Sequence, residues 1–458
     1  MDIRSWIEKE RSEIQKGLET FLRHPTISAQ PAYQASLHEC AHWLEEYLRD
    51  LGFRTALYGE PPVVYGHYQG PPDAPTLLFY GHYDVQPPDP LELWDSPPFE
   101  PTIRNGAIYA RGACDDKGQV WAHLVAWRYW ISHGGLPVSL HVVLEGQEET
   151  GSTTLYKVLA DQGAQWQSDA GIVSDTAFFS ESIPTLTTGL RGLLYVEIRV
   201  DGPVRDLHPG TLGGVVQNPA WALASILAQL KGPDGRVKIP GFYDGIRPPD
   251  PDLRRQWQTL PAHEAHYLSI TGAPALWGEV GFSPLERATI RPTLDIHGLY
   301  SGYIGEGSKT IIPAYALAKV SMRLVPDQDP EKIWEAFQAY IQTLTPPGVR
   351  VSVHRLHDPA PAFETPTDSP FYRAAEEAIQ EAFGKAPIPL KEGGSIPVLA
   401  ALQKVVSGPI VLMGFGLPTD QVHSPNEHFH LKQLWGGIYA AAAFYQKVGT
   451  LRVTRGES

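Results

Sequence analysis

The stretch LLFYGHYDVQPPD, residues 77–89, places a histidine and an aspartate two residues apart at the end of an apolar run. In an extended chain, side chains two residues apart point to the same face. His82 and Asp84 are therefore expected to emerge together from the end of a buried strand, where they could take part in binding a metal ion. By itself the pair is also typical of a turn, because a glycine and two prolines flank it.

Four further groups of acidic residues or histidine follow predicted strands or sharp turns. They are Asp115 and Asp116 in RGACDDKGQ, Glu148 and Glu149 in VVLEGQEETGS, Asp175 in IVSDT, and His423 in GFGLPTDQVHSPNEHFH. Each group alone could be a helix N-cap, a solvated loop or a turn. In open α/β sheets, however, ligand sites lie outside the carboxyl ends of the strands. We therefore expect these side chains to gather at one edge.

That edge is expected to bind divalent metal ions. Carboxylates that lie close together repel one another, and their pKa values rise. A divalent cation removes this conflict. Two imidazoles among carboxylates favour zinc, and also manganese or cobalt, over magnesium or calcium.

The elements that must position these residues alternate between helices and strands. Apolar residues recur at helical spacing over residues 3–22 and 36–51, and Gly52 ends the second helix as a C′ glycine. Strands are then predicted at residues 76–80, 139–145 and 170–175, with helices between them. This order indicates an α/β fold with a mostly parallel sheet and helices on both faces.

The pattern changes after Thr188. An alternating strand at 193–201, helices that begin at Asn218-Pro219 and Asp329-Pro330, and a strand at 349–356 indicate an inserted α+β layer of the β-α-β-β-α-β type. A helix that ends at Phe383 and a strand at 409–416 return the chain to the first sheet. We therefore predict a sheet domain formed by residues 1–188 and 362–458, and an inserted domain formed by residues 189–361.

The net charge, the apolar stretches and the cysteines of the chain limit its possible binding partners and location. The formal net charge is −14, which argues against binding to nucleic acid or to an anionic membrane. No stretch approaches the apolar length of a membrane span, and the charged N-terminus has no signal-peptide pattern. The two cysteines, Cys40 and Cys114, are far apart and provide no disulfide framework. A cytoplasmic location is therefore expected.

Six motifs, in this order, resemble those of the dizinc aminoacylase/carnosinase family of metallopeptidases, which also contains succinyl-diaminopimelate desuccinylase and acetylornithine deacetylase. They are GHYDVQP, ARGACDDKG, EGQEETGS, VSDT, EGGSIP and HSPNE. The resemblance extends from about residue 20 to about residue 445. It implies a zinc-exopeptidase-like catalytic domain, an inserted lid and dimerisation domain, and a homodimer formed through that domain.

The resemblance also implies two divalent metal ions, zinc in the first place, with manganese or cobalt as alternatives. Asp115 resembles the carboxylate that bridges both ions. His82 and Asp175 would complete the first site, and Glu149 and His423 the second.

Two further residues would support the chemistry by the same resemblance. Asp84 resembles the partner that orients His82. Glu148 resembles the general base that activates a metal-bridging water. In the family the peptide bond after Asp115 is often cis, and the same is expected here.

Five residues are implied to contact the substrate. His208 would stabilise the oxyanion, and in dimeric relatives this histidine comes from the partner subunit. Arg323 would bind the free carboxylate of the substrate. Thr310, Ser395 and His357 are further candidates for substrate contacts.

Three residues near these motifs are not expected to be ligands. Cys114 adjoins a ligand, but the family does not use this cysteine. His428 and His430 are expected to be surface histidines at the start of a helix.

The family contains several kinds of hydrolase. Members with aspartate at the position of Asp175 tend to be dipeptidases and aminopeptidases, and YGHYDVQP and GGSIP look most like carnosinase-type dipeptidases. We therefore expect hydrolysis of dipeptides or short peptides with a free C-terminal carboxylate. An N-acyl-amino-acid deacylase is the alternative enzyme. A non-catalytic metal-binding or scaffold protein is the alternative of another class, and the presence of Glu148 argues against it.

Overall fold

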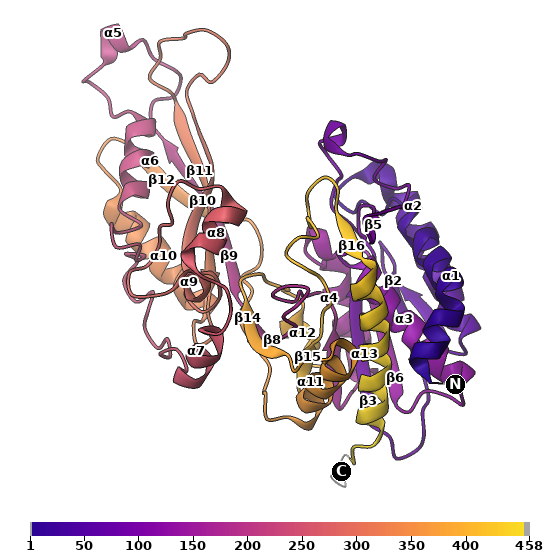
Figure 1. The fold of residues 1–458 in the computed structure, drawn as a ribbon. Coiled ribbons are helices and arrows are strands. Elements are labelled where there is room, and N and C mark those ends of the chain that lie inside the picture. Colours follow the sequence, from indigo (N-terminus) through magenta and orange to yellow (C-terminus); the bar gives the residue numbers. More distant parts are fainter. Residues whose placement is uncertain (1, 453–458) are drawn as a thin grey trace. The chain divides into compact units, whose positions relative to one another are not determined.

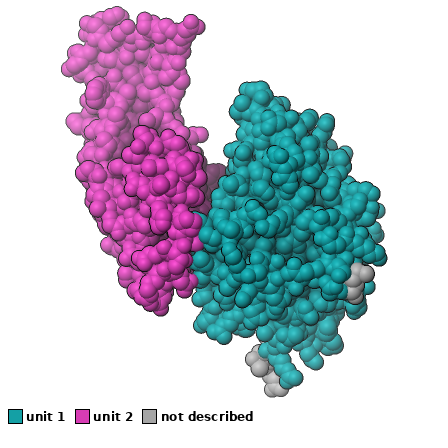
Figure 2. Space-filling model, in the orientation of Figure 1, with its two compact units in different colours: residues 1–188, 365–390, 398–458 teal, residues 189–364, 391–397 magenta. Residues whose placement is uncertain are grey.

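The structure is a computed structural model that describes residues 2–452. The chain divides into two units (Figure 2). Unit 1 contains the described residues of 1–188, 365–390 and 398–458, and unit 2 contains residues 189–364 and 391–397. The sequence-based division assigned residues 391–397 to the sheet domain, whereas the structure groups this segment with unit 2.

A mixed sheet forms the centre of unit 1 (Figure 1). Its strands, in spatial order, are β1 (Arg54–Tyr58), β2 (Val63–Tyr68), β6 (Ser139–Glu145), β3 (Thr76–His82), β7 (Ala170–Val173), β15 (Ile410–Leu412), β8 (Thr185–Leu190) and β13 (Phe363–Glu364), and β14 (Ile388–Glu392) also pairs with β8. The four adjacent strands β6, β3, β7 and β15 are parallel to their neighbours within this group. The pairs β1–β2, β2–β6, β15–β8 and β13–β8 are antiparallel. The predicted α/β class is confirmed, and the parallel part is the centre of the sheet.

The central strands are buried on both faces, which explains their continuous apolar sequences. Every residue of β6 is buried, as are six of the seven residues of β3. The predicted strand at 409–416 is regular only over Ile410–Leu412.

Helices cover this sheet. They are α1 (Ile3–Leu22), α2 (Gln34–Asp50), α3 (Lys117–Ser132), α4 (Thr153–Gln162), α11 (Pro370–Phe383), α12 (Leu399–Leu402) and α13 (Leu431–Gly449). Helix α3 packs against α1 and α13, and α11 packs against α13 (Figure 1). Because α3 is enclosed by these helices and the sheet, its apolar residues are not confined to one face. Gly384 ends α11 in the left-handed conformation at φ 76°, as its sequence predicts.

A small second sheet lies in unit 1. It consists of β4 (Thr102–Arg104), β5 (Ala107–Tyr109) and β16 (His428–His430), in the order β16-β5-β4. Asn105 and Gly106 join β4 to β5 with φ angles of 50° and 76°, the tight turn that an Asn-Gly pair favours. The sheet thereby connects the chain just before α3 to the chain just before α13.

Unit 2 has an antiparallel sheet of its own. Its strands, in spatial order, are β10 (Thr293–Ser301), β11 (Tyr315–Leu324), β9 (Gly192–Asp201) and β12 (Arg350–Arg355). Its helices are α5 (Pro209–Leu212), α6 (Pro219–Ala228), α7 (Pro251–Trp257), α8 (Glu264–Thr271), α9 (Pro284–Thr289) and α10 (Pro330–Leu344). Buried and half-buried residues alternate along β9, and α6 and α10 pack against this sheet. Asn218 and Asp329 cap these two helices, each followed by proline.

Short 3₁₀ turns complete the elements. They are η1 (Pro31–Tyr33), η2 (Leu91–Leu93), η3 (Glu148–Thr150) and η4 (Gly163–Gln165). Among residues 2–452, no helix has the length and apolar character needed to cross a membrane.

Candidate metal centre

The ends of three adjacent parallel strands supply part of the centre. His82 is the last residue of β3, and Asp175 follows the end of β7 by two residues. The turn η3, with Glu148 and Glu149, follows β6. These strands are neighbours in the sheet, so their carboxyl ends deliver the side chains to one edge.

Two loops complete the arrangement. Asp115 precedes α3, and the peptide bond between Asp115 and Asp116 is cis, as the resemblance led us to expect. His423 lies in the loop between β15 and β16 and has a left-handed backbone, with φ 61°.

The side chains form two groups that share Asp115. Nε2 of His82 lies 3.0 Å from Oδ1 of Asp115 and 4.0 Å from Oδ2 of Asp175. Nε2 of His423 lies 3.0 Å from Oδ2 of Asp115 and 3.3 Å from Oε1 of Glu149. In each group the potential ligand atoms lie within 4.8 Å of one another. Each oxygen of Asp115 therefore faces a different histidine, as the oxygens of a bridging carboxylate would.

The orientation of His82 fits a metal ligand. Its Nδ1 lies 3.1 Å from the backbone oxygen of Asp84 and donates a hydrogen bond to it. In the neutral ring, Nε2 then carries the lone pair. This buried Nε2 has no hydrogen-bond partner in the described part of the chain, although it faces the carboxylates of Asp115 and Asp175. A cation between these groups would satisfy all of them, and histidine nitrogen with carboxylate oxygen is a donor set that suits zinc.

The pKa values of these side chains also favour a bound cation. Burial, together with the neighbouring carboxylates, raises the pKa values of Glu148 and Asp175 well above their usual range. Burial lowers the pKa of His82, but the carboxylates of Asp115 and Asp84 raise it by more. The negative charges of the cluster thus destabilise one another, and divalent cations would relieve this repulsion.

Asp84 holds the turn that carries Glu148 and Glu149. Its carboxylate is fully buried and accepts the backbone N–H of Glu148 at Oδ1 and that of Glu149 at Oδ2, each at 3.1 Å. Oδ1 also lies 3.4 Å from Nδ1 of His82. The sequence suggested only the contact with His82, because the amide contacts depend on the geometry of η3. Asp84 therefore touches elements of both ligand groups.

Three residues make supporting contacts that were not predicted from the sequence, although Asp116 was among the acidic residues expected at this edge. Nε2 of Gln86 donates to Oε2 of Glu149 at 2.7 Å. Oδ2 of Asp116 accepts the backbone N–H of His82 at 3.3 Å. Gln86 continues the two-residue spacing of His82 and Asp84. This spacing is the sequence feature that could have indicated its role.

The third is Glu427, the last residue of the HSPNE motif. Its buried carboxylate accepts the backbone N–H groups of Gly112, Cys114 and Asp115 at 2.9, 3.0 and 3.1 Å. It also pairs with Arg111 at 2.7 Å, and both of these side chains are 1% exposed. Glu427 thus fixes the backbone that presents Asp115. The sequence could have pointed to Glu427 because it belongs to the HSPNE motif, in which only the histidine, His423, was given a role.

Among the predicted substrate-contact residues, Arg323 and Ser395 lie together in unit 2. Nη1 of Arg323 donates to Oγ of Ser395 at 2.8 Å, and this hydroxyl donates to the backbone oxygen of Arg191. Burial lowers the pKa of Arg323 from its usual value. Ser395 belongs to the segment 391–397, which groups with unit 2.

The other three predicted contact residues are exposed in unit 2. Nδ1 of His208 accepts the backbone N–H of Gly210 at 3.0 Å, so in the neutral ring Nε2 carries the hydrogen and can donate. The ring of His357 stacks on Tyr195 with 5.8 Å between centroids. Thr310 lies between β10 and β11.

The prediction that His428 and His430 are both surface residues at a helix start is wrong for His428. His428 is buried in β16, where it pairs with Tyr109 of β5, and its ring stacks on that tyrosine with 4.5 Å between centroids. His430 is half-buried and precedes α13. The buried position arises from pairing between segments that are distant in sequence.

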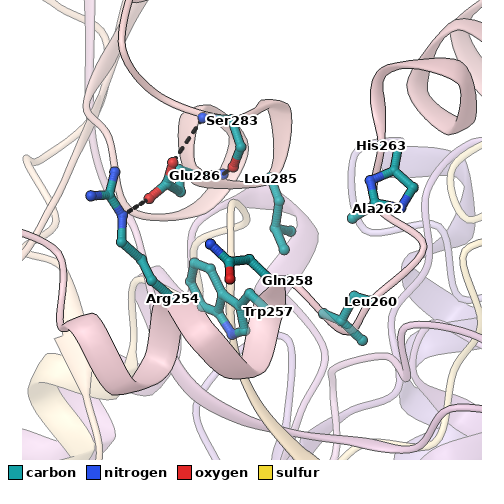
Figure 3. Close-up of a pocket in the computed structure, with 9 residues that line it drawn as sticks. All are labelled: Arg254, Trp257, Gln258, Leu260, Ala262, His263, Ser283, Leu285 and Glu286. Atoms are coloured by element: carbon teal, nitrogen blue, oxygen red, sulfur yellow. Dashed lines mark hydrogen bonds and ion pairs between the residues drawn. The ribbon is translucent and has the colours of Figure 1, made fainter.

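Unit 2 contains a cavity of about 290 Å³. It is lined by Arg254, Trp257, Gln258, Leu260, Ala262, His263, Ser283, Leu285 and Glu286 (Figure 3). Its acidic residue, Glu286, is already paired with Arg254 and with the backbone N–H of Ser283 (Figure 3). The cavity therefore offers no group of metal ligands comparable to that of unit 1.

Comparison with known proteins agrees with this chemistry. The family model "Peptidase family M20/M25/M40" matches residues 78–447. A Cys-Gly metallodipeptidase of Schizosaccharomyces pombe is 29% identical, over 97% of this chain and 97% of the relative. A Beta-Ala-His dipeptidase of Mus musculus is also 29% identical, over 86% and 82%.

Among solved structures, an M20 family metallo-carboxypeptidase of Sulfolobus solfataricus is 31% identical. It covers 96% of this chain and 100% of its own, with a TM-score of 0.87. The family match spans most of the chain and contains all five side chains of the two ligand groups. The chain is therefore a hydrolase that belongs to peptidase family M20/M25/M40.

Proposed function

We propose that the chain is a metal-dependent dipeptidase that hydrolyses the amide bond of dipeptides or short peptides with a free C-terminal carboxylate. The observation that carries the proposal is the pair of ligand groups that share Asp115, with Glu148 beside the ligand Glu149. The names of the relatives support the substrate class, since they describe a Cys-Gly metallodipeptidase and a Beta-Ala-His dipeptidase.

The five ligands in this proposal are the residues of the two groups. His82 and Asp175 would hold one ion and Glu149 and His423 the other, with Asp115 common to both groups. Two divalent ions bound there would polarise the scissile carbonyl and acidify the attacking water. Zinc suits the donor set, and manganese and cobalt are also compatible with it.

The proton transfers belong to Glu148. Its carboxylate accepts a proton from the attacking water and returns it to the leaving nitrogen. Asp84 supports this role because it holds the backbone N–H of Glu148 at 3.1 Å and so fixes the start of the turn. Adjacent glutamates serve different purposes here, Glu149 as a ligand and Glu148 as a base.

Substrate contacts are assigned to unit 2. The guanidinium of Arg323, oriented by Ser395 at 2.8 Å, would bind the free carboxylate of the peptide. His208, with its Nε2–H directed away from its own backbone contact, would donate to the oxyanion. Thr310 and His357 are proposed as further contacts.

Assembly and location complete the proposal. We propose a homodimer formed through unit 2, because large apolar side chains are exposed there, among them Trp221, Leu299 and Ile304. The two cysteines are buried and unpaired, which fits a cytoplasmic enzyme. The acidic net charge fits neither a nucleic acid nor an anionic membrane as partner.

The test is substrate preference after controlled metal loading. Protein stripped with a chelator is reloaded with zinc, manganese or cobalt and assayed on Cys-Gly, β-Ala-His, their C-terminal amides and N-acetyl amino acids. The proposal expects the free dipeptides to be hydrolysed with the highest kcat/KM and the amides to lose most of it. A preference for N-acetyl amino acids over every dipeptide would instead identify a deacylase.

A further inference from the structure

A third group of metal-ligand side chains lies in unit 1, apart from the five proposed ligands. It consists of Asp420, His428 and His430. Oδ1 of Asp420 lies 3.9 Å from Nε2 of His428 and 3.7 Å from Nε2 of His430. One potential ligand atom from each residue lies within 4.8 Å of the others.

The carboxylate of Asp420 has one satisfied oxygen and one unsatisfied oxygen. Oδ2 accepts the backbone N–H of Leu417 at 2.7 Å. Oδ1 is buried and has no hydrogen-bond partner among the described residues, and the side chain as a whole is 0% exposed. Leaving a buried carboxylate oxygen without a partner is costly, so this atom requires a hydrogen-bond donor or a cation.

The neighbouring histidines do not supply that donor, and the thiol of Cys114, which contacts the Asp420 carboxylate, is only a weak one. Nδ1 of His428 donates to the backbone oxygen of Asn426 at 2.9 Å, so the neutral ring presents the lone pair of Nε2 toward Asp420. Burial lowers the pKa of His428, which favours this neutral form. The distances of 3.9 and 3.7 Å also exceed hydrogen-bond length.

Those same distances suit a shared cation. Zinc binds histidine nitrogen and carboxylate oxygen at about 2.0–2.2 Å, which places ligand atoms of one ion roughly 3–4 Å apart. His428 is oriented by the ring of Tyr109 and by its bond to Asn426. The side chain of His430 is 28% exposed, which gives an ion a path from solvent.

We propose that Asp420, His428 and His430 form a third divalent-metal site of the zinc class, with water in the remaining position. The site is separate from the two groups that share Asp115, because it has no residue in common with them.

This site would fix the loop that presents His423. The loop runs from Asp420 to His428, and three of its non-glycine residues have left-handed backbones: Gln421 at φ 54°, His423 at 61° and Asn426 at 62°. Such conformations persist only where the surroundings hold them. An ion bound to both ends of the loop would provide that restraint. The third ion is therefore a structural ion that positions His423.

The experiment is metal stoichiometry of untagged full-length protein. The stripped protein is titrated with zinc, and bound metal is measured by mass spectrometry after removal of free metal. We expect three ions in the wild type and two in His430→Gln. His38→Gln, which removes an exposed histidine that also lies beside a carboxylate, is the matched control and should keep three.

A second set of variants shows whether the loss of an ion in His430→Gln could result from misfolding. His82→Gln combined with His423→Gln removes a ligand from each of the other two groups and should retain one ion. Adding His430→Gln should remove that ion. With cobalt in place of zinc, the retained ion should show the absorption of a nitrogen- and oxygen-ligated site. A wild type that binds only two ions, or a third ion that survives His430→Gln, would overturn the proposal.

Discussion

Replacing Asp84 by asparagine should weaken metal binding at both ligand groups. The carboxylate accepts two backbone N–H groups, those of Glu148 and Glu149, at 3.1 Å each. An asparagine has one acceptor oxygen, so its amide NH₂ must face one of the two N–H donors. The turn carries the proposed ligand Glu149, and Nδ1 of His82 lies 3.4 Å from Oδ1 of Asp84, so the disturbance reaches both groups.

The expected size follows from the lost contact. A hydrogen bond to a charged group contributes about 1.5–3 kcal/mol. If this is lost from the metal-bound geometry, affinity falls by a factor of about 10–150. The same range is typical for residues that orient metal ligands.

The assay is a competitive zinc titration against a chromophoric chelator, fitted for two ions. His430→Gln is used as the background, so that an ion at the third proposed site does not enter the fit. Asp73→Asn, which removes an exposed aspartate of unit 1, is the matched control and should leave both affinities unchanged. Affinities within threefold of the background protein for Asp84→Asn would refute the reasoning, because Asp84 would then not hold the ligands in place.

Three further predictions concern stability and substrate binding. Arg111→Met leaves the carboxylate of Glu427 buried without its cation and should lower the free energy of unfolding in urea by about 3–5 kcal/mol. Arg49→Met removes an arginine whose side chain is 58% exposed and should cost less than about 1 kcal/mol. Burial lowers the pKa of His141 to about 4. In the unfolded chain the pKa of this histidine is about 6.5, so the unfolded state binds the proton at a higher pH than the folded state does. The free energy of unfolding therefore falls as pH decreases from about 6.5 toward 4. His141→Gln should remove about 2 kcal/mol of the loss that the wild type shows between pH 7 and pH 5, and an unchanged pH profile would contradict this. Arg323→Lys should raise KM for dipeptides more than it lowers kcat, because a lysine cannot make the two parallel hydrogen bonds of a guanidinium. In steady-state kinetics, a KM equal to that of the wild type would show that the residue does not contact substrate.

The sequence was most informative where local periodicity determines direction. The position of His82 and Asp84 at the end of a buried strand follows from the alternation of side chains, and the structure has both at the end of β3 or just after it. The meeting of His82, Glu149 and Asp175 was expected because neighbouring parallel strands end at one edge, whereas Asp115 and His423 reach that edge from loops. These features required only the strand pattern and the rule for ligand sites in open sheets.

Contacts that depend on tertiary pairing could not be predicted in the same way. The burial of His428 results from pairing of β16 with β5, and neither short strand has a strong pattern of its own. The amide contacts of Asp84 depend on the 3₁₀ geometry at Glu148, and the cradle of Glu427 depends on a loop that is distant in sequence. The segment 391–397 likewise joins unit 2 through contacts such as that of Ser395 with Arg323.

The central claim is that Glu148 moves the proton while its neighbours hold the metal. It is tested most directly by the kcat of Glu148→Gln on a dipeptide, at metal occupancy matched to the wild type by mass spectrometry. The change preserves size and removes the basic oxygen, and Glu100→Gln on the surface is the control. We predict full metal content with kcat lower by a factor of about 10²–10⁴. A variant that binds the same metal and hydrolyses the dipeptide at the wild-type rate would contradict the claim.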